Sequence, residues 1–340
     1  WDFAAYRFLT GLGVGGEFAV GVALVAEVMP TTARAHALGW LQMLSTIGNI
    51  SAAFINIGLG VMEGEGAFDG SEWKPWRLMF VVGAVPALLA ILIRSRLKEP
   101  EKWQQAVADG ATPKKAGSMA ELFGDPRWRR NAIVGLCLAV PGVVGLWAIG
   151  FFSFDFIRSV FKQHYEREGL SPDEYRGKLT VLVGITSVLL NIGAGLGMYS
   201  FKLFTERHGR RPAFAVAFVL AILGTTGTFW FLNDFYDVFW MIPLMGFCQL
   251  SLFGGYAIYF PELFPTRLRS TGTSFCYNVG RYVAALGTIT RGGLIKLVGD
   301  QVHDEVLAWR YTALAMSSVF LIGLLALPFA PETRGQPLPE

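Results

Sequence analysis

Charged residues are scarce in this chain. Among its 340 residues, Lys, Arg, Asp and Glu make up only 16%, whereas they make up about 25% of an average soluble domain. Hydrophobic residues make up 53%, and the mean hydropathy is +0.43. This is not the composition of an ordinary soluble protein, and it indicates a chain that lies in a membrane.

Residue types that carry enzyme chemistry are also few. The three cysteines, Cys137, Cys248 and Cys276, all lie in apolar runs, where packing explains them better than a disulfide or a metal site does. The four histidines lack the spacing of metal ligands. No nucleophile–base pair and no phosphate-binding loop is recognisable in the sequence. The sequence therefore predicts no enzyme activity, no metal and no cofactor.

Long apolar runs fill most of the chain. A helix that crosses the hydrocarbon core of a bilayer needs about 20 apolar residues, and a single segment in lipid satisfies its backbone hydrogen bonds only as a helix. The runs predict an all-α integral membrane protein, a helical bundle with about nine transmembrane helices. The predicted spans are roughly 3–28, 37–61, 76–94, 131–156, 179–201, 213–232, 239–260, 271–295 and 310–329.

Glycine is abundant, with 40 residues, which is typical of helices that pack closely in lipid. Gly11 and Gly15 in the first predicted span have the spacing of a close helix contact. Gly193 and Gly197 have the same spacing in the fifth span. We expect helix packing, rather than contact with a ligand, at these four positions.

One short pattern occurs twice. Glu-x-x-Pro-x-x-x-Arg occupies residues 27–34 and again residues 262–269, and each copy lies between two apolar runs. An internal repeat of this kind indicates two structural halves with equivalent parts. In a membrane protein, two such halves are typical of a transporter that rocks about a central site.

Basic residues gather on one side of the predicted membrane. The loops after spans one, three, five and seven, together with the tail, hold most of the Lys and Arg residues. By the positive-inside rule this side is cytoplasmic, so the C-terminus is cytoplasmic and the N-terminus is outside. The plasma membrane, in a bacterium the inner membrane, is the predicted location. The net charge of +3 reflects the excess of basic residues on the cytoplasmic side and predicts no nucleic-acid partner.

Four motifs resemble those of the major facilitator superfamily, and they extend over essentially the whole chain. The similarity is closest to its sugar-porter and metabolite:proton-symporter branches. Two positions depart from the family pattern: Ala35, where a glycine is usual after the arginine, and Lys202, four residues before Glu206, where a glycine is expected. The matching segments are residues 7–34, 206–211, 261–266 and 331–335.

The resemblance implies a domain organisation. The predicted spans are similar to helices four to twelve of a twelve-helix fold, so we expect a truncated chain that lacks three helices upstream of Trp1. Residues 1–94 would form a partial N-terminal half with helices four to six. Residues 95–130 would form a cytoplasmic linker, and residues 131–340 a complete six-helix half with a cytoplasmic tail. The resemblance also implies a monomer.

Charged residues at the cytoplasmic helix ends form the first candidate site. The resemblance implies that they latch the inner side when the cavity faces outward, although ordinary positive-inside anchors are the alternative. Exposed ion pairs contribute at most about 1 kcal/mol each, so a latch requires a network. We expect Glu27 and Arg34 to pair partly with a loop of the absent segment. The predicted latch residues are Glu27, Arg34, Arg207, Arg210, Arg211, Glu262, Arg269 and Glu332.

Polar residues inside the spans form the second candidate site, because charge within a membrane is costly unless it is paired or hydrated. Glu17 and Arg281 come from opposite halves at similar depth. Helix-to-helix hydrogen bonds are the alternative for the uncharged residues, and a structural ion pair is the alternative for Glu17 with Arg281. The predicted cavity residues are Glu17, Arg281, Asn278, Gln249, Gln42 and Asn49.

These residues predict a secondary active transporter. Arg281 suits a carboxylate because guanidinium geometry allows two parallel hydrogen bonds, and Glu17 suits proton transfer if burial raises its pKa. The predicted cargo is a small polar metabolite, for which the resemblance favours an organic anion, moved with protons by alternating access. The alternatives are a facilitator of neutral sugars or polyols that relies on Gln42, Asn49 and Gln249, a non-transporting sensor, and a truncated remnant.

Overall fold

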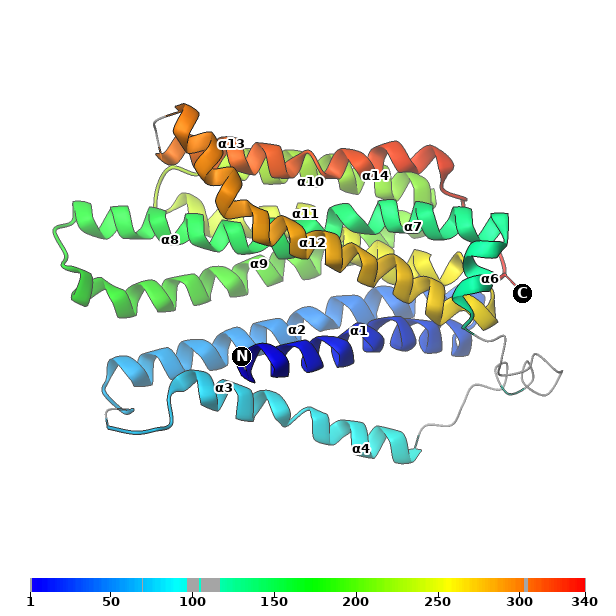
Figure 1. Ribbon diagram of the computed structural model, residues 1–340, viewed down its shortest axis with the longest axis horizontal. Coiled ribbons are helices and arrows are strands. Elements are labelled where there is room, and N and C mark those ends of the chain that lie inside the picture. Colours follow the sequence, from blue (N-terminus) through cyan, green and yellow to red (C-terminus); the bar gives the residue numbers. More distant parts are fainter. Residues whose placement is uncertain (1, 69, 97–103, 105–116, 303–304, 340) are drawn as a thin grey trace.

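The computed structural model describes residues 2–68, 70–96, 104, 117–302 and 305–339, and these residues form helices and no strand. Most helices run along the long axis of the molecule (Figure 1). The helices are α1 (Asp2–Val28), α2 (Thr31–Gly64), α3 (Pro75–Ala84), α4 (Ala87–Arg96), α6 (Met119–Gly124), α7 (Pro126–Val144), α8 (Gly150–Arg167), α9 (Pro172–His208), α10 (Arg210–Phe231), α11 (Asp237–Glu262), α12 (Thr266–Val302), α13 (Glu305–Ser317) and α14 (Phe320–Ala326).

The predicted spans correspond to these helices. Seven helical segments in the described part of the chain are long and apolar enough to cross a membrane, which confirms the all-α membrane fold. Segment 266–302 is long enough, but it contains several arginines and a lysine. The third predicted span is divided into α3 and α4. Pro86 lies at that break, where it cannot donate a backbone hydrogen bond to the helix.

The main bundle, α6 to α14, holds nearly all of the buried core. Within it α9 and α11 approach most closely, because glycines line their contact. A Cβ on Gly193 would lie 1.9 Å from the carbonyl oxygen of Pro243, and a Cβ on Gly197 would lie 2.2 Å from that of Phe247. The predicted close packing at Gly193 and Gly197 is therefore confirmed. A Cβ on Gly11, by contrast, would have no atom of another helix within 4 Å in the described chain.

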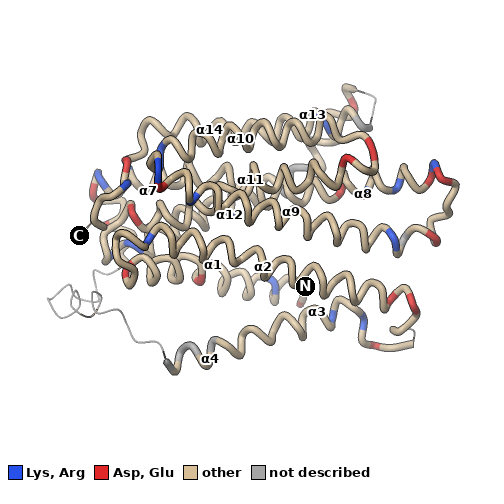
Figure 2. The backbone as a smooth tube through the Cα atoms, turned by 180° about the vertical axis from the view of Figure 1, so that it is seen from behind, with Lys and Arg blue, Asp and Glu red and all other residues tan. Residues whose placement is uncertain are grey.

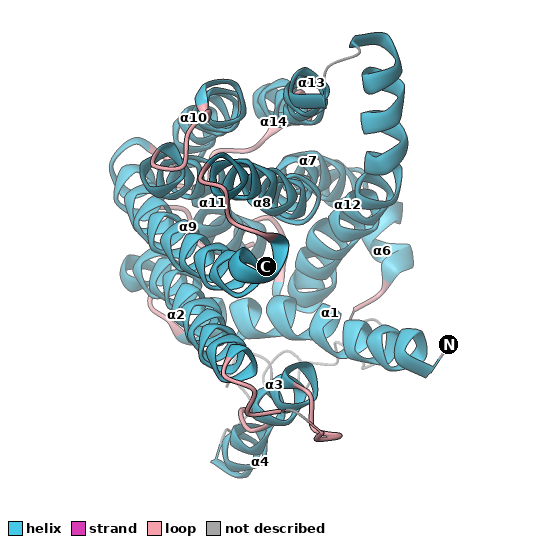
Figure 3. Ribbon diagram, turned by 90° about the vertical axis from the view of Figure 1, so that its left-hand side faces the viewer, coloured by secondary structure: helices cyan, strands magenta, loops and turns pink. Residues whose placement is uncertain are grey.

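The first layer, α1 to α4, lies along one side of the main bundle. α2 packs along α9 and α1 packs against α12, while α3 and α4 lie farthest from the main bundle (Figures 1 and 3). Large apolar side chains of α1 and α2, such as Phe8 and Phe54, remain exposed. Exposed apolar side chains are what a helix presents to lipid or to further helices.

The predicted linker, residues 95–130, is described in part. Residues 97–103 and 105–116 lie outside the described residues. Its last portion forms the short helix α6, whose first turn is capped by Ser118. α7 then begins at Pro126 rather than at residue 131, because the Asp125 side chain accepts hydrogen bonds from the first free backbone N–H groups of the helix.

Charged residues lie mainly toward the two ends of the bundle, and the middle is largely uncharged (Figure 2). One end carries α6, the α1–α2, α9–α10 and α11–α12 turns, and the C-terminal tail, residues 330–339. We call it the tail end. It brings the predicted latch residues into one region.

Candidate functional site

The repeated Glu-x-x-Pro-x-x-x-Arg pattern folds the same way in both copies. Each copy ends one helix and begins the next at the tail end. Nε of Arg34 donates to the carbonyl oxygen of Ala26 at 2.9 Å, and Nε of Arg269 donates to that of Pro261 at 3.1 Å. In both cases the acceptor lies eight residues earlier. The last carbonyl groups of a helix lack backbone partners, and the repeated arginine satisfies one of them.

An ion pair joins the first layer to the main bundle. Nη1 of Arg269 lies 2.7 Å from Oε1 of Glu27, and the two side chains are 1% and 9% exposed. Within the described residues, the partner of Glu27 is the arginine of the other copy of the pattern. The pair therefore connects α1 to α12 at a buried position. Removing one member of a buried pair costs about 3–5 kcal/mol, because the other charge is left without a partner.

A second buried ion pair lies within the main bundle. Arg210 forms two hydrogen bonds to the carboxylate of Glu262, Nε to Oε2 at 3.0 Å and Nη2 to Oε1 at 2.7 Å. The hydroxyl of Thr333 donates to the same carboxylate. This arrangement holds the start of α10, the end of α11 and the tail together. Two-point guanidinium–carboxylate pairs are stronger and more directional than single contacts.

Glu332 caps the N-terminus of α10. Its carboxylate accepts hydrogen bonds from the backbone N–H groups of Arg210 at 2.9 Å, Arg211 at 3.0 Å and Arg334 at 3.0 Å. Burial of the carboxyl acts to raise the pKa of Glu332, but these three donors outweigh it and hold the pKa below 4.5. Gly209 precedes the helix at a φ of 97°, and a Cβ there would lie 2.8 Å from Oε2 of Glu332. The cap therefore requires glycine at this position.

The remaining predicted latch residues, Arg34, Arg207 and Arg211, differ in the contacts that they make. Nη2 of Arg211 donates to the carbonyl oxygen of Pro328 at 3.2 Å and so holds the tail. Arg207 is exposed and forms no ion pair with the described residues. Arg34 is buried and bonded to a carbonyl group rather than to a carboxylate. Arg207 is therefore outside the observed network.

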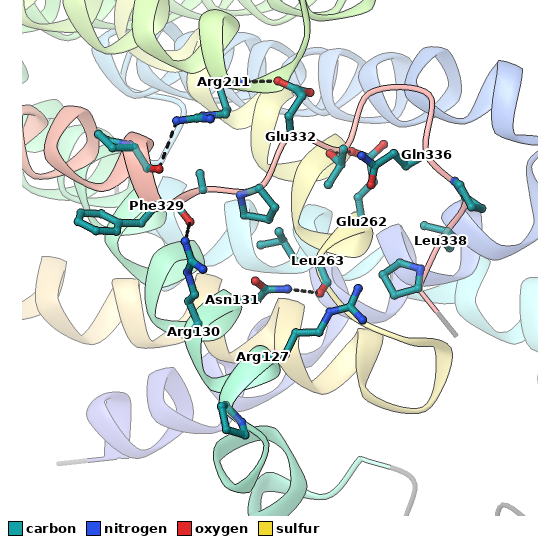
Figure 4. Close-up of a pocket in the computed structure, with 17 residues that line it drawn as sticks. Arg127, Arg130, Asn131, Arg211, Glu262, Leu263, Phe329, Glu332, Gln336 and Leu338 are labelled. Carbon is teal, nitrogen blue, oxygen red and sulfur yellow. Dashed lines mark hydrogen bonds between the residues drawn. The ribbon is translucent and has the colours of Figure 1, made fainter.

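A cavity of about 890 Å³ lies under the tail. The α7 side of the cavity carries Arg127, Arg130 and Asn131, and the side chain of Asn131 donates to the carbonyl oxygen of Leu263 at 2.8 Å. Arg211 and Glu332 lie at the opposite side (Figure 4). Arg127 and Arg130 were not among the predicted site residues. The available signal was the cluster of arginines at the start of a helix, where cations are unfavourable.

Arg281 lies at the seam between α12 and α1. Its guanidinium carbon is 4.6 Å from the centre of the Tyr277 ring, and that ring stacks on Phe18 of α1 at a centroid distance of 4.3 Å. Nε of Arg281 is buried and has no hydrogen-bond partner among the described residues. A buried donor of this kind is unfavourable by about 1–3 kcal/mol, and more when charged, so Arg281 is a candidate to bind an anion.

Asn278 lies one turn from Arg281 and also contacts α1. Its Nδ2 donates to the carbonyl oxygen of Gly15 at 2.6 Å and to the hydroxyl of Ser274 at 2.9 Å. Oδ1 of Asn278 is buried without a partner in the described chain. Glu17 lies on the adjoining turn of α1, is exposed, and forms no ion pair with Arg281 among the described residues. The structure thus brings the two elements together without pairing the two charges.

The uncharged cavity candidates make contacts between helices. Nδ2 of Asn49 on α2 donates to Oδ1 of Asn191 on α9 at 3.0 Å. Gln249 is 1% exposed, and its Nε2 lies 3.4 Å from the hydroxyl of Thr225 on α10. Both contacts agree with the alternative of helix-to-helix hydrogen bonding. Gln42 is half-buried on α2.

Sequence reasoning missed two members of these contacts. Asn191 is a polar residue in an apolar run, the same signal that identified Asn49, and it could have been found in that way. Tyr277 carries no charge, so the search for charges inside spans passed over it. Its stacking on Phe18 depends on the packing of α1 against α12, which the sequence does not reveal.

Comparison with known proteins places these features in a family. The family model described as Major Facilitator Superfamily matches residues 1–287. A protein of Haemophilus influenzae provisionally named a metabolite transport protein is 26% identical over 342 residues, which cover 99% of this chain and 75% of that protein. The cis,cis-muconate transport protein of Acinetobacter baylyi is 29% identical over 307 residues, with 86% of this chain and 65% of that protein covered.

A solved structure shares the fold. The proton:xylose symporter XylE, bound to 6-bromo-6-deoxy-D-glucose, superposes with a TM-score of 0.70 at 17% sequence identity. The match covers 99% of this chain and 72% of the symporter. Together with the helical bundle and the repeated motif, these matches show that the chain belongs to the Major Facilitator Superfamily of membrane transporters.

Proposed function

We propose that this chain forms most of a secondary active transporter that moves an organic anion together with protons by alternating access. The observation that carries the proposal is Nε of Arg281, which is buried without a hydrogen-bond partner among the described residues, on a half-buried side chain at the seam between α12 and α1. A relative is named a cis,cis-muconate transport protein, and muconate is a dicarboxylate. The fold neighbour is named a proton:xylose symporter, which supports coupling to protons.

Arg281 would bind the carboxylate of the cargo. Contact with the Tyr277 ring restrains the guanidinium, and the planar guanidinium can form two parallel hydrogen bonds to a carboxylate. Asn278, with a free buried carbonyl oxygen one turn away, would orient a hydroxyl or a protonated group of the same cargo. The anion would neutralise a charge that is otherwise costly inside a membrane.

Glu17 would carry the proton. It lies on α1 beside Phe18, whose ring reaches the same tyrosine that supports Arg281. A carboxylate that takes a proton when the cavity closes would offset the charge of the incoming anion. Gln42 would line the central cavity between the first layer and the main bundle, and Asn49 and Gln249 would position the helices that form this cavity.

The ion-pair network at the tail end would act as the latch. The Glu27–Arg269 pair bridges the first layer and the main bundle, and the contacts of Arg210, Glu262 and Glu332 keep the tail end ordered. When the network forms, the tail end is closed and the cavity opens at the opposite end. We place the tail end in the cytoplasm and the chain in a bacterial inner membrane.

A facilitator of neutral sugars is the second candidate, favoured by the fold shared with a sugar-bound symporter. In that case Gln42 and Asn49 would contact the cargo, and uptake would not depend on Arg281. A sensor would bind cargo without uptake, and a truncated remnant would do neither. Each alternative therefore predicts a different pattern of binding and flux.

Uptake into proteoliposomes tests the proposal. The protein made from its own gene is assayed with labelled cis,cis-muconate and with labelled xylose, each with and without a proton gradient. Arg281→Ala should abolish muconate uptake and Arg281→Lys should weaken it, because an ammonium group cannot form the two parallel hydrogen bonds of a guanidinium. Arg207→Gln, which removes an exposed unpaired arginine, is the control. Equal muconate uptake in wild type and both Arg281 variants would reject the anion site, and xylose uptake alone would support the facilitator.

A further inference from the structure

α7 begins with a cluster of cations that its own structure does not compensate. Arg127, Arg129 and Arg130 lie in its first two turns and are exposed. The N-terminus of a helix carries partial positive charge, so cations are unfavourable there. Asp125 provides one carboxylate, which caps the backbone N–H groups of Arg127 and Trp128. None of the three arginines forms an ion pair with a carboxylate in the described part of the chain.

In α10, carboxylates of the protein balance a similar cluster of arginines at the helix N-terminus. It also begins with two arginines, Arg210 and Arg211. There the carboxylate of Glu262 pairs with the side chain of Arg210, and the carboxylate of Glu332 caps the helix. α12 begins at the same end with Arg267 and Arg269, which pair with Glu121 and Glu27. Of these three helices, α7 alone has no arginine in an ion pair with a carboxylate of the described residues. The comparison indicates that α7 receives its anion from outside the chain.

An apolar groove leads away from these arginines between α7 and α14. Its volume is about 550 Å³, and Arg129 and Arg130 stand at its charged end. Leu325 is 74% exposed and Ile133 is 50% exposed along its walls. The groove shares Pro126, Arg130 and Phe329 with the cavity under the tail. A single ligand with a negative head and an apolar chain would match both the arginines and the apolar walls of the groove.

We propose that this groove binds one anionic phospholipid, with its phosphate on Arg129 and Arg130. One acyl chain would lie along the apolar part of the groove. A free phosphate would satisfy the arginines but leave the apolar walls uncovered, so the continuous groove favours the lipid. Basic clusters at the membrane boundary bind anionic headgroups in this manner. The other groove residues are Pro126, Ile133, Val134, Cys137, Ile322, Leu325, Ala326 and Phe329.

The lipid would also hold the tail in place. Nη2 of Arg130 donates to the carbonyl oxygen of Phe329 at 3.3 Å, and the backbone of Phe329 leads directly to Glu332, which caps α10. A headgroup that fixes Arg130 would therefore favour the closed latch. This consequence rests on the proposed function, whereas binding of the lipid does not.

Native mass spectrometry of the purified full-length protein tests the site. The protein in detergent is titrated with phosphatidylglycerol, with phosphatidylcholine and, separately, with inorganic phosphate. We expect one saturable phosphatidylglycerol site that the Arg129→Gln/Arg130→Gln double variant weakens about 30-fold, the loss expected for two basic groups at an anionic surface. Arg207→Gln, an exposed arginine at the same end, should leave the affinity unchanged.

A second variant keeps the test decisive if the double variant fails to fold. Ile133→Trp fills the groove and leaves the arginines intact, so it should weaken phosphatidylglycerol binding. Equal binding of phosphatidylcholine, or an equal loss in Arg207→Gln, would overturn the site. Inorganic phosphate that binds as tightly as phosphatidylglycerol and is unaffected by Ile133→Trp would assign the arginines to a soluble anion instead. Lipid binding is measured without transport. A failure to bind phosphatidylglycerol therefore leaves the transport proposal unaffected, and a failure of transport leaves the lipid proposal unaffected.

Discussion

The Glu27–Arg269 pair is the one ion pair that the described residues form between the first layer and the main bundle. We predict that Glu27→Gln opens the tail end. The substitution keeps the shape of the side chain and one hydrogen bond to Arg269, but it removes the charge. A hydrogen bond to a charged group contributes about 1.5–3 kcal/mol and a neutral one about 1 kcal/mol, and the arginine left behind is almost completely buried. The expected shift toward the open state is about 2 kcal/mol, or roughly 30-fold.

Spin labels at the tail end measure this shift directly. Thr31 on α2 and His208 on α9 are both exposed, and cysteines at these positions report the separation of the first layer from the main bundle. The native cysteines are first replaced by serine or alanine. In Glu27→Gln, the population with the longer distance between the labels should increase roughly 30-fold relative to the population with the shorter distance.

The control is Glu166→Gln, which removes a carboxylate that pairs with Lys162 at 3.7 Å on the surface of α8. Exposed pairs contribute about 0–1 kcal/mol, so this change should leave the distance distribution as it is in wild type. If Glu27→Gln also leaves the distribution unchanged, the pair does not hold the tail end closed and the latch is refuted.

Two other predictions concern packing and pH. Gly193→Ala should lower the unfolding temperature strongly in a thermal unfolding assay, because its Cβ would lie 1.9 Å from the carbonyl oxygen of Pro243. Gly16→Ala should be nearly neutral, because its Cβ would have no atom of another helix within 4 Å in the described chain. Folding lowers the pKa of Glu332 below 4.5, so its contribution to stability is complete above pH 4.5 and is lost as the pH falls through the lowered value. Limited proteolysis should therefore release the tail at acidic pH in wild type, and should release it at neutral pH in Glu332→Ala.

The sequence predicted the helices well because apolar length determines what can cross a membrane. It did not reveal the break within the third span, where Pro86 divides a continuous apolar run into α3 and α4. Hydropathy averages over such a break, and the effect of a proline depends on whether neighbouring groups replace the lost hydrogen bond.

The candidate site was predictable as a set of residues but not as a set of pairs. The repeated pattern identified Glu27, Glu262 and Arg269 from sequence alone. Which carboxylate meets which arginine depends on how α1 packs against α12 and how the tail crosses α10. For the same reason Asn49 was recognised as polar but not as the partner of Asn191.

The two copies of the repeated pattern offer a matched measurement of the ion pair. Arg34 and Arg269 each donate to a carbonyl group eight residues earlier, but only Arg269 also pairs with a carboxylate. Arg34→Gln should therefore destabilise the protein by about 1.5–3 kcal/mol, the contribution of a hydrogen bond from a charged donor. Arg269→Gln should add about 3 kcal/mol, because Glu27 is left buried without its partner. Equal losses of unfolding free energy would mean that Glu27 is solvated in the native protein, and the pair would then contribute nothing to holding the first layer against the main bundle.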